Sequence, residues 1–466
     1  MNLNNYHIAY FLGIGGIGMS ALARWFNAHG LSVSGYDRTS SPLTEELQKE
    51  DIQVHFEDHP DRIPENVRAG QDNVLVVYTP AIPTDHKELN FLMEKGYAVY
   101  KRSEVLGALT EGHYTVAVAG THGKTTTSTM ISHLLYASGH PTAAFLGGIS
   151  RNYATNLLLS KDESKEYTVV VEADEFDRSF LTLVPNLAVI TSTDADHLDI
   201  YGDHGHMEEA FLSFAGKVNK QGKLFLGPRA AGMKGKAGWV STETYGQDDD
   251  LIHPQNIRPE GRRCLFDVQV YDRQIKDLEL YMPGFHNVEN ATVAIAVALE
   301  LGIDEEAIRE GIRTFSGIRR RFEYVLNSDS VVYIDDYAHH PEEIRALLKS
   351  VRSLYPGKRI TAVFQPHLYS RTRDFAEGFS ESLSLADEVL LLDIYPAREE
   401  PIPGVSSDML MEGITAPVKK RVSKEDLCST LESLQPEVVL TVGAGDIDRL
   451  VDKVKTCLTG GENENR

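Results

Sequence analysis

A glycine- and threonine-rich turn, Gly120-Thr-His-Gly-Lys-Thr-Thr126, joins an apolar run to a helical pattern. The run Thr115–Ala119 predicts a strand, and the apolar residues from Met130 to Leu135 predict a helix. Backbone N–H groups in such a turn attract phosphate. Lys124 is placed to reach the terminal phosphates of a nucleoside triphosphate, and the hydroxyl of Thr125 to bind Mg²⁺. The sequence therefore predicts an ATP site, with a ligand-free turn of the same composition as the alternative.

Two further strand-like runs end in acidic clusters. The run Tyr167–Val171 is followed by Glu172-Ala-Asp-Glu175, and the run Leu187–Ser192 by Asp194-Ala-Asp-His197. Ligands bind at the carboxyl ends of parallel strands, so we expect both clusters to face the phosphate-binding turn and to hold metal ions. Solvated charges at the strand ends are the alternative. His197 by itself is ambiguous, because Mg²⁺ prefers oxygen ligands.

A second glycine-rich turn lies near the start of the chain. Gly13-Ile-Gly15-Gly-Ile-Gly18 follows the apolar run His7–Leu12 and precedes a helical stretch. Asp37 comes about 20 residues later, as in dinucleotide-binding folds. The pattern predicts that a phosphate-bearing ligand approaches this turn, without specifying the ligand.

Asn287 and Asn290 lie one helical turn apart, just before an alanine-rich helical stretch at 291–301. Their amide groups are suited to contact a base or a phosphate. Capping of the helix by asparagine is an equally open interpretation.

The last third of the chain predicts another open α/β sheet, because strand-like runs alternate with helical segments. The runs are 331–334, 360–364, 389–392 and 438–442. Polar stretches follow the first two, and they place Asp336, Tyr337, His339, His367 and Arg371 at strand ends. The basic trio Arg319–Arg321 is most often a solvated patch, but beside a triphosphate it would neutralise developing negative charge.

Length and composition limit the possible classes of protein. At 466 residues the chain predicts about three domains, which we place at 1–106, 107–318 and 319–466. The formal charge of −22 argues against a nucleic-acid partner. The three cysteines predict reduced thiols in a cytoplasmic protein. The N-terminus predicts a strand and turn rather than a signal peptide, and no apolar run is long enough to span a membrane. Residues 227–262 are expected to form loops.

Together these motifs resemble the Mur ligase family of ATP-dependent amide-bond-forming enzymes, closest to its alanine-adding branch, over essentially the whole chain. The stretches that carry the resemblance are Gly13–Ser20, Gly120–Thr127, Glu172–Glu175, Asp196–Asp199, His286–Asn290, Arg320–Phe322, Asp336–Pro341 and Phe364–His367. The resemblance implies an α/β fold of three domains. These are an N-terminal Rossmann-like domain for a UDP-linked substrate, a central P-loop ATPase-like domain with a mostly parallel sheet, and a C-terminal Rossmann-like domain that receives the amino acid.

The implied activity is an ATP-dependent acid–amino-acid ligase of peptidoglycan precursor synthesis. It joins L-alanine to the lactyl carboxylate of UDP-N-acetylmuramate through an acyl phosphate, as a monomer or homodimer without a membrane partner. Lys124, His339 and Arg371 are the implied catalytic residues. The implied ATP contacts are Gly120, Thr121, His122, Gly123, Lys124, Thr125, Thr126, Asn287, Asn290, Arg321 and Asp336. The implied Mg²⁺ ligands are Thr125, Glu172 and His197.

The resemblance also assigns substrate contacts. Residues implied near the UDP-linked substrate are Gly15, Gly16, Ile17, Gly18, Ser20, Asp37, Thr79, Ala81 and His122. Those implied near L-alanine are Tyr337, His339, His367 and Arg371. The sequence departs from the family pattern at Leu368, where an arginine is common, and at Tyr36, where a small hydroxyl residue is common.

Three other functions fit parts of the pattern. A sister ligase that joins a preformed peptide to the same UDP-sugar in cell-wall recycling shares the ATP motifs. A nicotinamide-dependent dehydrogenase would explain the first glycine turn and Asp37, but it has no use for a triphosphate-binding lysine. A non-catalytic nucleotide switch would leave the histidines of the last third unexplained.

Overall fold

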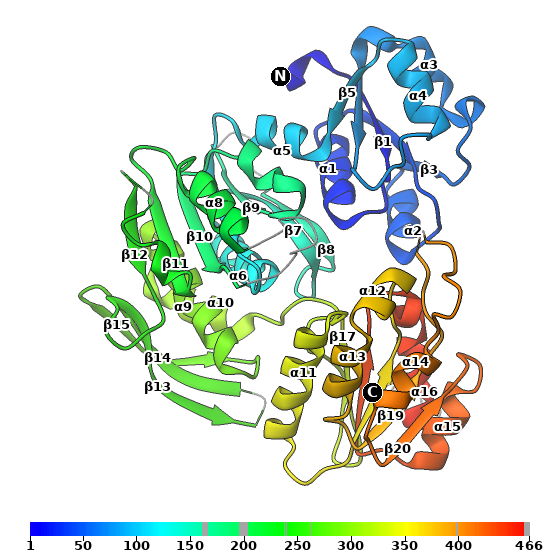
Figure 1. Ribbon diagram of the computed structural model, residues 1–466. Coiled ribbons are helices and arrows are strands. Elements are labelled where there is room, and N and C mark those ends of the chain that lie inside the picture. Colours follow the sequence, from blue (N-terminus) through cyan, green and yellow to red (C-terminus); the bar gives the residue numbers. More distant parts are fainter. Residues whose placement is uncertain are drawn as a thin grey trace. The chain divides into compact units, whose positions relative to one another are not determined.

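The structure is a computed structural model that describes residues 1–160, 166–194, 204–236, 238, 240–261, 263–397 and 399–460. The chain forms two compact units, residues 1–317 and residues 318–466. Figure 1 shows both units, coloured along the sequence. The predicted α/β class is confirmed, since three open sheets in these units are wholly or mostly parallel.

The first unit begins with a five-stranded parallel sheet in the order β3-β2-β1-β4-β5. Its strands are β1 (Ile8–Leu12), β2 (Ser32–Tyr36), β3 (Gln53–His55), β4 (Val74–Tyr78) and β5 (Ala98–Lys101). Its helices are α1 (Ile17–Ala28), α2 (Pro42–Lys49), α3 (Glu65–Ala69), α4 (Lys87–Glu94) and α5 (Arg102–Thr110). The apolar residues of β1 and β4 are almost completely buried, as expected for central strands of a parallel sheet. The predicted Rossmann-like arrangement is confirmed.

A seven-stranded sheet follows in the same unit, in the order β12-β11-β10-β6-β9-β7-β8. Only the β7–β8 pair is antiparallel among these neighbours. The strands are β6 (Tyr114–Ala119), β7 (Thr142–Ser150), β8 (Thr155–Leu159), β9 (Thr168–Glu172), β10 (Leu187–Ser192), β11 (Lys223–Arg229) and β12 (Ser241–Thr244). The helices are α6 (Lys124–Ala137), α8 (His204–Ala215), α9 (Phe285–Glu300) and α10 (Glu305–Thr314). The strand order brings β9 and β10 to either side of β6, which ends at the phosphate-binding turn.

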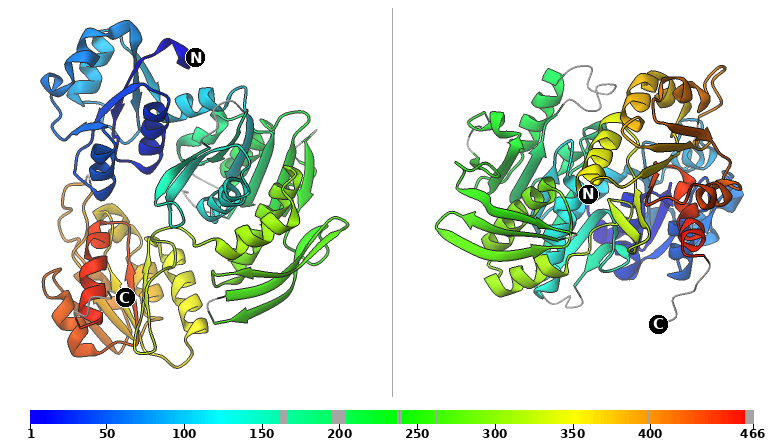
Figure 2. Two further views of the ribbon diagram at one scale, coloured as in Figure 1. Left: turned by 180° about the vertical axis from the view of Figure 1, so that it is seen from behind. Right: turned by 90° about the horizontal axis from the view of Figure 1, so that it is seen from below.

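The prediction of loops at 227–262 is wrong in part. This region holds the end of β11 and all of β12 and β13 (Ile252–Glu260), and β13 pairs antiparallel with β14 (Arg263–Val270). Strand β15 (Arg273–Leu280) completes a three-stranded sheet beside α9 and α10 (Figure 2). Strands β14 and β15 bury several of their residues in the core, but β13 is largely exposed from Asn256 onward and contains two prolines. The strand is therefore stabilised by pairing with β14, a partner that local composition does not reveal.

The sheet of the first domain is tied to the central sheet through α1. Asn156, on β8, donates its side-chain amide to Ile17 O at 2.6 Å and to Ser20 Oγ at 2.8 Å. Arg24 is also hydrogen-bonded to the Asn156 side chain and forms an ion pair with Glu50 at 2.7 Å. The first turn of α1 is thus held in a defined position against β8.

The second unit contains a six-stranded sheet in the order β16-β17-β21-β18-β19-β20, in which only the β16–β17 pair is antiparallel. The strands are β16 (Glu323–Asn327), β17 (Val332–Asp336), β18 (Ile360–Phe364), β19 (Glu388–Leu391), β20 (Val418–Arg421) and β21 (Val438–Val442). The helices are α11 (Pro341–Leu354), α12 (Tyr369–Asp374), α13 (Ala376–Leu383), α14 (Asp408–Gly413), α15 (Leu427–Leu434) and α16 (Val451–Leu458). The four predicted strand-like runs correspond to β17, β18, β19 and β21. In the described part of the chain, no helix combines the length and apolar character needed to cross a bilayer.

Candidate active site

The phosphate-binding turn adopts a conformation that requires glycine at two positions. Gly120 has φ +129°, and a Cβ there would lie 2.2 Å from Thr191 Oγ1. Gly123 is left-handed, with φ +80°, and it caps the N-terminus of α6. Both conformations are unfavourable for other residues. The turn therefore exposes the N-terminus of α6, where the helix dipole and the unbonded N–H groups favour an anion.

Strand β10 is hydrogen-bonded to the phosphate-binding turn on one side. Thr121 N donates to Ser192 O at 3.0 Å, and His122 N donates to Ser192 Oγ at 2.9 Å. The hydroxyl of Thr191 donates to His122 O. These bonds fix the conformation of the turn. Thr191 and Ser192 were not among the predicted site residues, because their role depends on the neighbouring position of β6 and β10.

Lys124 lies in the turn and is held by two acceptors. Its Nζ donates to Gly120 O at 2.7 Å and to Glu175 Oε1 at 2.9 Å. Glu175 is fully buried, and the Lys124 side chain is 13% exposed. Burial alone would lower the pKa of Lys124, but the carboxylates of Glu175, Glu172 and Asp174 outweigh it and raise the pKa above the ordinary lysine value. Lys124 is therefore a cation oriented in the turn, as phosphate binding requires.

The predicted Mg²⁺ ligands are only partly within the described residues. Thr125 is the second residue of α6 and is buried, and Glu172 is the last residue of β9. A Cβ at Gly147 would lie 2.0 Å from Glu172 Oε2, so only glycine leaves room for this carboxylate. His197 lies outside the described residues. Within the described ranges, no group of three or more His, Cys, Asp and Glu side chains has the arrangement of a metal site. A hydroxyl and a carboxylate are hard oxygen donors that suit Mg²⁺ when nucleotide phosphates supply further oxygens.

Helix α9 brings Asn290 against the phosphate-binding turn. Asn290 Oδ1 accepts a hydrogen bond from Thr127 Oγ1 at 3.1 Å, and a Cβ at Gly123 would lie 3.0 Å from the same oxygen. Asn287 instead donates to Pro283 O at 2.6 Å. Gly284 is the N-cap of α9, so neither asparagine caps the helix by position. Of the two, Asn290 is the one in contact with the turn.

The first glycine turn is hydrogen-bonded by side chains that lie beside it. Asp37 Oδ2 accepts a hydrogen bond from Gly15 N at 2.7 Å, and a Cβ at Gly15 would lie 2.8 Å from that oxygen. Burial raises the pKa of Asp37. Ser20 donates to Ile17 O at 3.0 Å and is bonded by Asn156. The side chains of Asp37 and Ser20 are thus occupied in shaping the turn.

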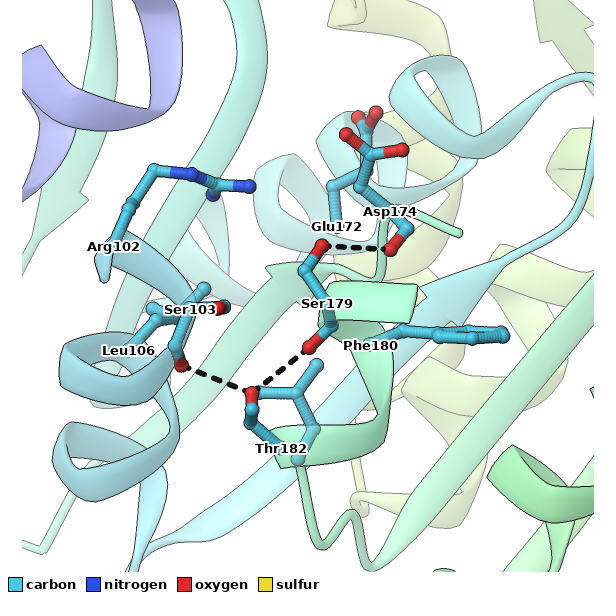
Figure 3. Close-up of a pocket in the computed structure, with 9 residues that line it drawn as sticks. Arg102, Ser103, Leu106, Glu172, Asp174, Ser179, Phe180 and Thr182 are labelled. Atoms are coloured by element: carbon cyan, nitrogen blue, oxygen red, sulfur yellow. Dashed lines mark hydrogen bonds between the residues drawn. The ribbon is translucent and has the colours of Figure 1, made fainter. Parts of the chain in front are cut away.

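A cavity of about 230 Å³ lies between this glycine turn and the end of β9. It is lined by Gly16, Ile17, Gly18, Met19, Thr79, Arg102, Leu106, Phe145, Leu146, Gly147, Glu172 and Asp174. Figure 3 shows an adjoining pocket that shares Arg102, Leu106, Glu172 and Asp174 with this cavity, and in it Arg102 on α5 lies opposite the carboxylates of Glu172 and Asp174. The cavity therefore brings predicted substrate and metal residues together. Ala81 is exposed and does not line it.

The second unit gathers its own predicted residues at the ends of β17 and β18. The His339 ring is 5.2 Å from the Tyr337 ring and 6.3 Å from the His367 ring. Glu343 accepts a hydrogen bond from His339 N at 2.9 Å and lies 3.5 Å from its Nδ1. Burial lowers the pKa of His339, although the charge of Glu343 opposes the shift. The imidazole is therefore neutral near pH 7 and able to accept a proton. The charge of Arg371 also acts on it.

Asp336 organises the segment that precedes β16. It accepts hydrogen bonds from Phe322 N at 2.7 Å and Ala338 N at 2.8 Å. Arg320 and Arg321 lie 5.1 and 5.6 Å from the centre of the Tyr337 ring. Arg320 also pairs with Asp335 at 3.2 Å. The basic trio is thus partly a structural element rather than a solvated patch.

Several residues in these sites were not predicted. Glu175 is predicted only as part of an acidic cluster that holds metal ions and not as the partner of Lys124, and Arg102, Glu343 and Tyr395 are not predicted. Tyr395 stacks on His367, with ring centres 5.8 Å apart. It reaches this position through a bridge between segments far apart in sequence. Among Arg102, Glu343 and Tyr395, the sequence offers a local signal for Arg102, which is a charged residue directly after strand β5.

Known proteins resemble this chain over nearly its whole length. The family models described as Mur ligase family, catalytic domain, Mur ligase middle domain, and Mur ligase, glutamate ligase domain match residues 8–114, 118–298 and 320–445. UDP-N-acetylmuramate–L-alanine ligase of Flavobacterium johnsoniae is 48% identical over 465 residues, covering 100% of both chains. The protein of that name from Christiangramia forsetii is 50% identical over 458 residues, covering 98% of this chain and 99% of its own.

Solved structures agree with this result. UDP-N-acetylmuramate-alanine ligase from Thermotoga maritima superimposes with a TM-score of 0.81 at 27% identity, covering 98% of this chain and 100% of its own. A murein peptide ligase from Psychrobacter arcticus has a TM-score of 0.71 at 22% identity, covering 99% of this chain and 100% of its own. The second match shows a shared fold.

Proposed function

The chain belongs to the Mur ligase family, and from that membership we infer that it is an ATP-dependent ligase joining L-alanine to UDP-N-acetylmuramate in peptidoglycan synthesis. The observation that carries the proposal is the match over nearly the full length of both chains to proteins named UDP-N-acetylmuramate–L-alanine ligase. Because ATP is the co-substrate, we propose a cytoplasmic location. We assign the UDP-linked substrate to residues 1–106, ATP to 107–318 and the amino acid to 319–466.

The reaction begins with activation of a carboxylate. A lactyl carboxylate oxygen attacks the γ-phosphorus of ATP, and the bond from that phosphorus to the β,γ-bridging oxygen breaks. ADP departs, and an acyl phosphate is formed. Both reactants are anionic, so Lys124, oriented by Glu175 and Gly120 O, offsets their repulsion. Thr125 and Glu172 are the residues proposed to hold Mg²⁺, which supplies further charge neutralisation when bound.

The amine of L-alanine then attacks the acyl carbon, and the carbon–oxygen bond to phosphate breaks to give the amide. The amine must be neutral to attack and loses a proton afterwards. We assign the proton acceptor to His339, whose lowered pKa keeps it neutral at physiological pH. Arg371 and His367 are proposed to bind the carboxylate of alanine. Leu368, which adopts a positive φ of 68° before α12, contributes no charge at the position where an arginine is common.

The test is phosphate release from ATP in the presence of UDP-N-acetylmuramate and L-alanine. Lys124→Ala is expected to reduce turnover by about 1000-fold, the scale of removing a cation that stabilises a transition state. Lys223→Ala is the matched control, since Lys223 pairs with Glu300 in the same unit, away from the turn. Near-normal turnover in Lys124→Ala would refute the assignment. Mass spectrometry of the product with L-alanine or a tripeptide as acceptor separates this activity from that of a peptide ligase.

A further inference from the structure

We propose that Glu399 is a positioning residue for the amino-acid substrate, because it holds the start of α12, which directly follows His367 and carries Arg371. The inference rests on the proposed function and adds to it a residue that no sequence motif indicated. Its basis is the set of contacts between α12 and the loop after β19, both of which belong to the second unit.

The backbone is strained at the residue that joins His367 to α12. Leu368 has φ 68°, a left-handed value that is unfavourable for a leucine. Its N–H donates to Tyr395 O at 3.0 Å, and Tyr395 N in turn donates to Pro366 O at 2.8 Å. A strained backbone persists only where its surroundings determine it, so these contacts with the loop after β19 set the direction in which the chain enters α12.

Glu399 supplies a second contact between this loop and α12. Its Oε2 accepts a hydrogen bond from Ser370 N at 2.9 Å, and its Oε1 accepts one from the Ser370 hydroxyl. Ser370 is the second residue of the helix, where a backbone N–H has no acceptor within the helix, and the N-cap Leu368 makes no side-chain capping bond. Burial alone would raise the pKa of Glu399, but the bonds from Ser370 outweigh it and lower the pKa. The ionised carboxylate thus fastens the first turn of α12 with both of its oxygens.

The start of α12 carries groups assigned to the carboxylate of alanine. The His367 ring stacks on Tyr395 with ring centres 5.8 Å apart, and it lies 6.3 Å from the His339 ring. Arg371 comes directly after Ser370, and its charge acts on His339. Across the part of the chain that the structure describes, the Arg371 guanidinium has no hydrogen-bond or ion-pair partner. Its position therefore depends on the helix that carries it, so a shift of α12 moves this cation relative to His339.

A carboxylate beside an amino-acid site has a second conceivable role, which is direct contact with the ammonium group of the substrate. Glu399 lies close enough to His367 for the charge of the imidazole to act on it. Both of its oxygens, however, already accept hydrogen bonds from Ser370. The structure therefore favours positioning, and the two roles predict different behaviour of the glutamine variant.

The experiment measures ATP-dependent phosphate release with UDP-N-acetylmuramate while the concentration of L-alanine is varied. Glu399→Ala is expected to raise the KM for L-alanine by about 10- to 100-fold, the scale of displacing a substrate-positioning group by about 1 Å. The KM values for ATP and UDP-N-acetylmuramate should stay within about twofold, because these substrates are assigned to other domains. Glu399→Gln should recover most of the loss, since an amide accepts a hydrogen bond from Ser370 N and donates one to its hydroxyl. Glu381→Ala is the matched control, because it removes an exposed glutamate that pairs with Arg345 at 3.1 Å in the same unit.

A second substitution tests the contact from the other side. Ser370→Ala removes the hydroxyl but keeps the N–H donor, so it should raise the KM for L-alanine by about 3-fold, less than Glu399→Ala does. The double variant should resemble Glu399→Ala, because both substitutions act through one contact. If Glu399→Ala does not fold, Ser370→Ala carries the test, and an unchanged KM for L-alanine in that variant refutes the role of Glu399.

The outcomes separate the positioning role from the proposed function. If the wild type releases no phosphate in response to L-alanine, the proposed function fails. If the wild type responds and Glu399→Ala has the same KM for L-alanine, the proposed function stands and the role of Glu399 is refuted. Equal impairment of Glu399→Gln and Glu399→Ala, or additive effects with Ser370→Ala, would place Glu399 in contact with the substrate and overturn the positioning role.

Discussion

Replacing Glu175 by glutamine tests whether the lysine of the phosphate-binding turn is held in place by a buried charge. Lys124 Nζ lies 2.9 Å from Glu175 Oε1, and the Glu175 side chain is fully buried. At an effective dielectric constant of about 20, two unit charges at that separation attract by roughly 6 kcal/mol. Desolvation offsets part of this attraction, and removal of one partner from a buried pair typically costs about 3–5 kcal/mol. We therefore expect Glu175→Gln to be strongly destabilising although it preserves shape.

When a nucleotide is present, we expect it to stabilise Glu175→Gln more than it stabilises the wild type. The phosphates of a non-hydrolysable ATP analogue supply the anionic partner that Lys124 has lost. The analogue should therefore raise the thermal midpoint of Glu175→Gln more than that of the wild type. Without nucleotide, a loss of about 3–5 kcal/mol in the free energy of unfolding lowers the thermal midpoint of a domain of about 150–250 residues by about 6–20 °C.

Differential scanning fluorimetry with and without the analogue measures both effects. Glu300→Gln is the matched control, because it removes the carboxylate of the partly exposed Lys223–Glu300 pair, 2.6 Å apart, in the same unit. Exposed pairs are worth about 0–1 kcal/mol, so this variant should melt close to the wild type. Equal midpoints for the two variants, or equal stabilisation of the wild type and Glu175→Gln by the analogue, would refute the reasoning.

Two further predictions concern groups near the site and in the first domain. Gly147→Ala places a methyl group 2.0 Å from Glu172 Oε2. We therefore expect phosphate release to show about 100-fold lower turnover and a higher Mg²⁺ concentration requirement. Gly232→Ala is the control, because its Cβ meets nothing within 4 Å. Burial raises the pKa of Glu88 to about 7, so the folded state retains its proton where the unfolded chain has lost it. The wild type should thus lose about 3 kcal/mol of stability relative to Glu88→Gln as pH rises from 4.5 to 7, and equal midpoint differences at pH 5 and pH 8 would contradict this.

Much of the fold followed from local pattern. Apolar runs such as Ile360–Phe364 and Val438–Val442 coincide with β18 and β21, because a fully buried parallel strand is a short continuous apolar segment. The same pattern does not predict the strand at 252–260, because the C-terminal half of β13 is largely exposed and the strand depends on pairing with β14.

The sequence by itself determined the phosphate-binding turn, because Gly120, Gly123 and Lys124 act through backbone geometry and a single helix N-terminus, which are local properties. Tertiary structure decided what surrounds it. The order β10-β6-β9 brings Thr191 and Glu175 from distant segments to the two sides of the turn. The packing of α1 and α5 likewise sets Arg102 against Gly18, 84 positions earlier in the chain. Such contacts depend on which strands become neighbours, and no spacing within one segment encodes that choice.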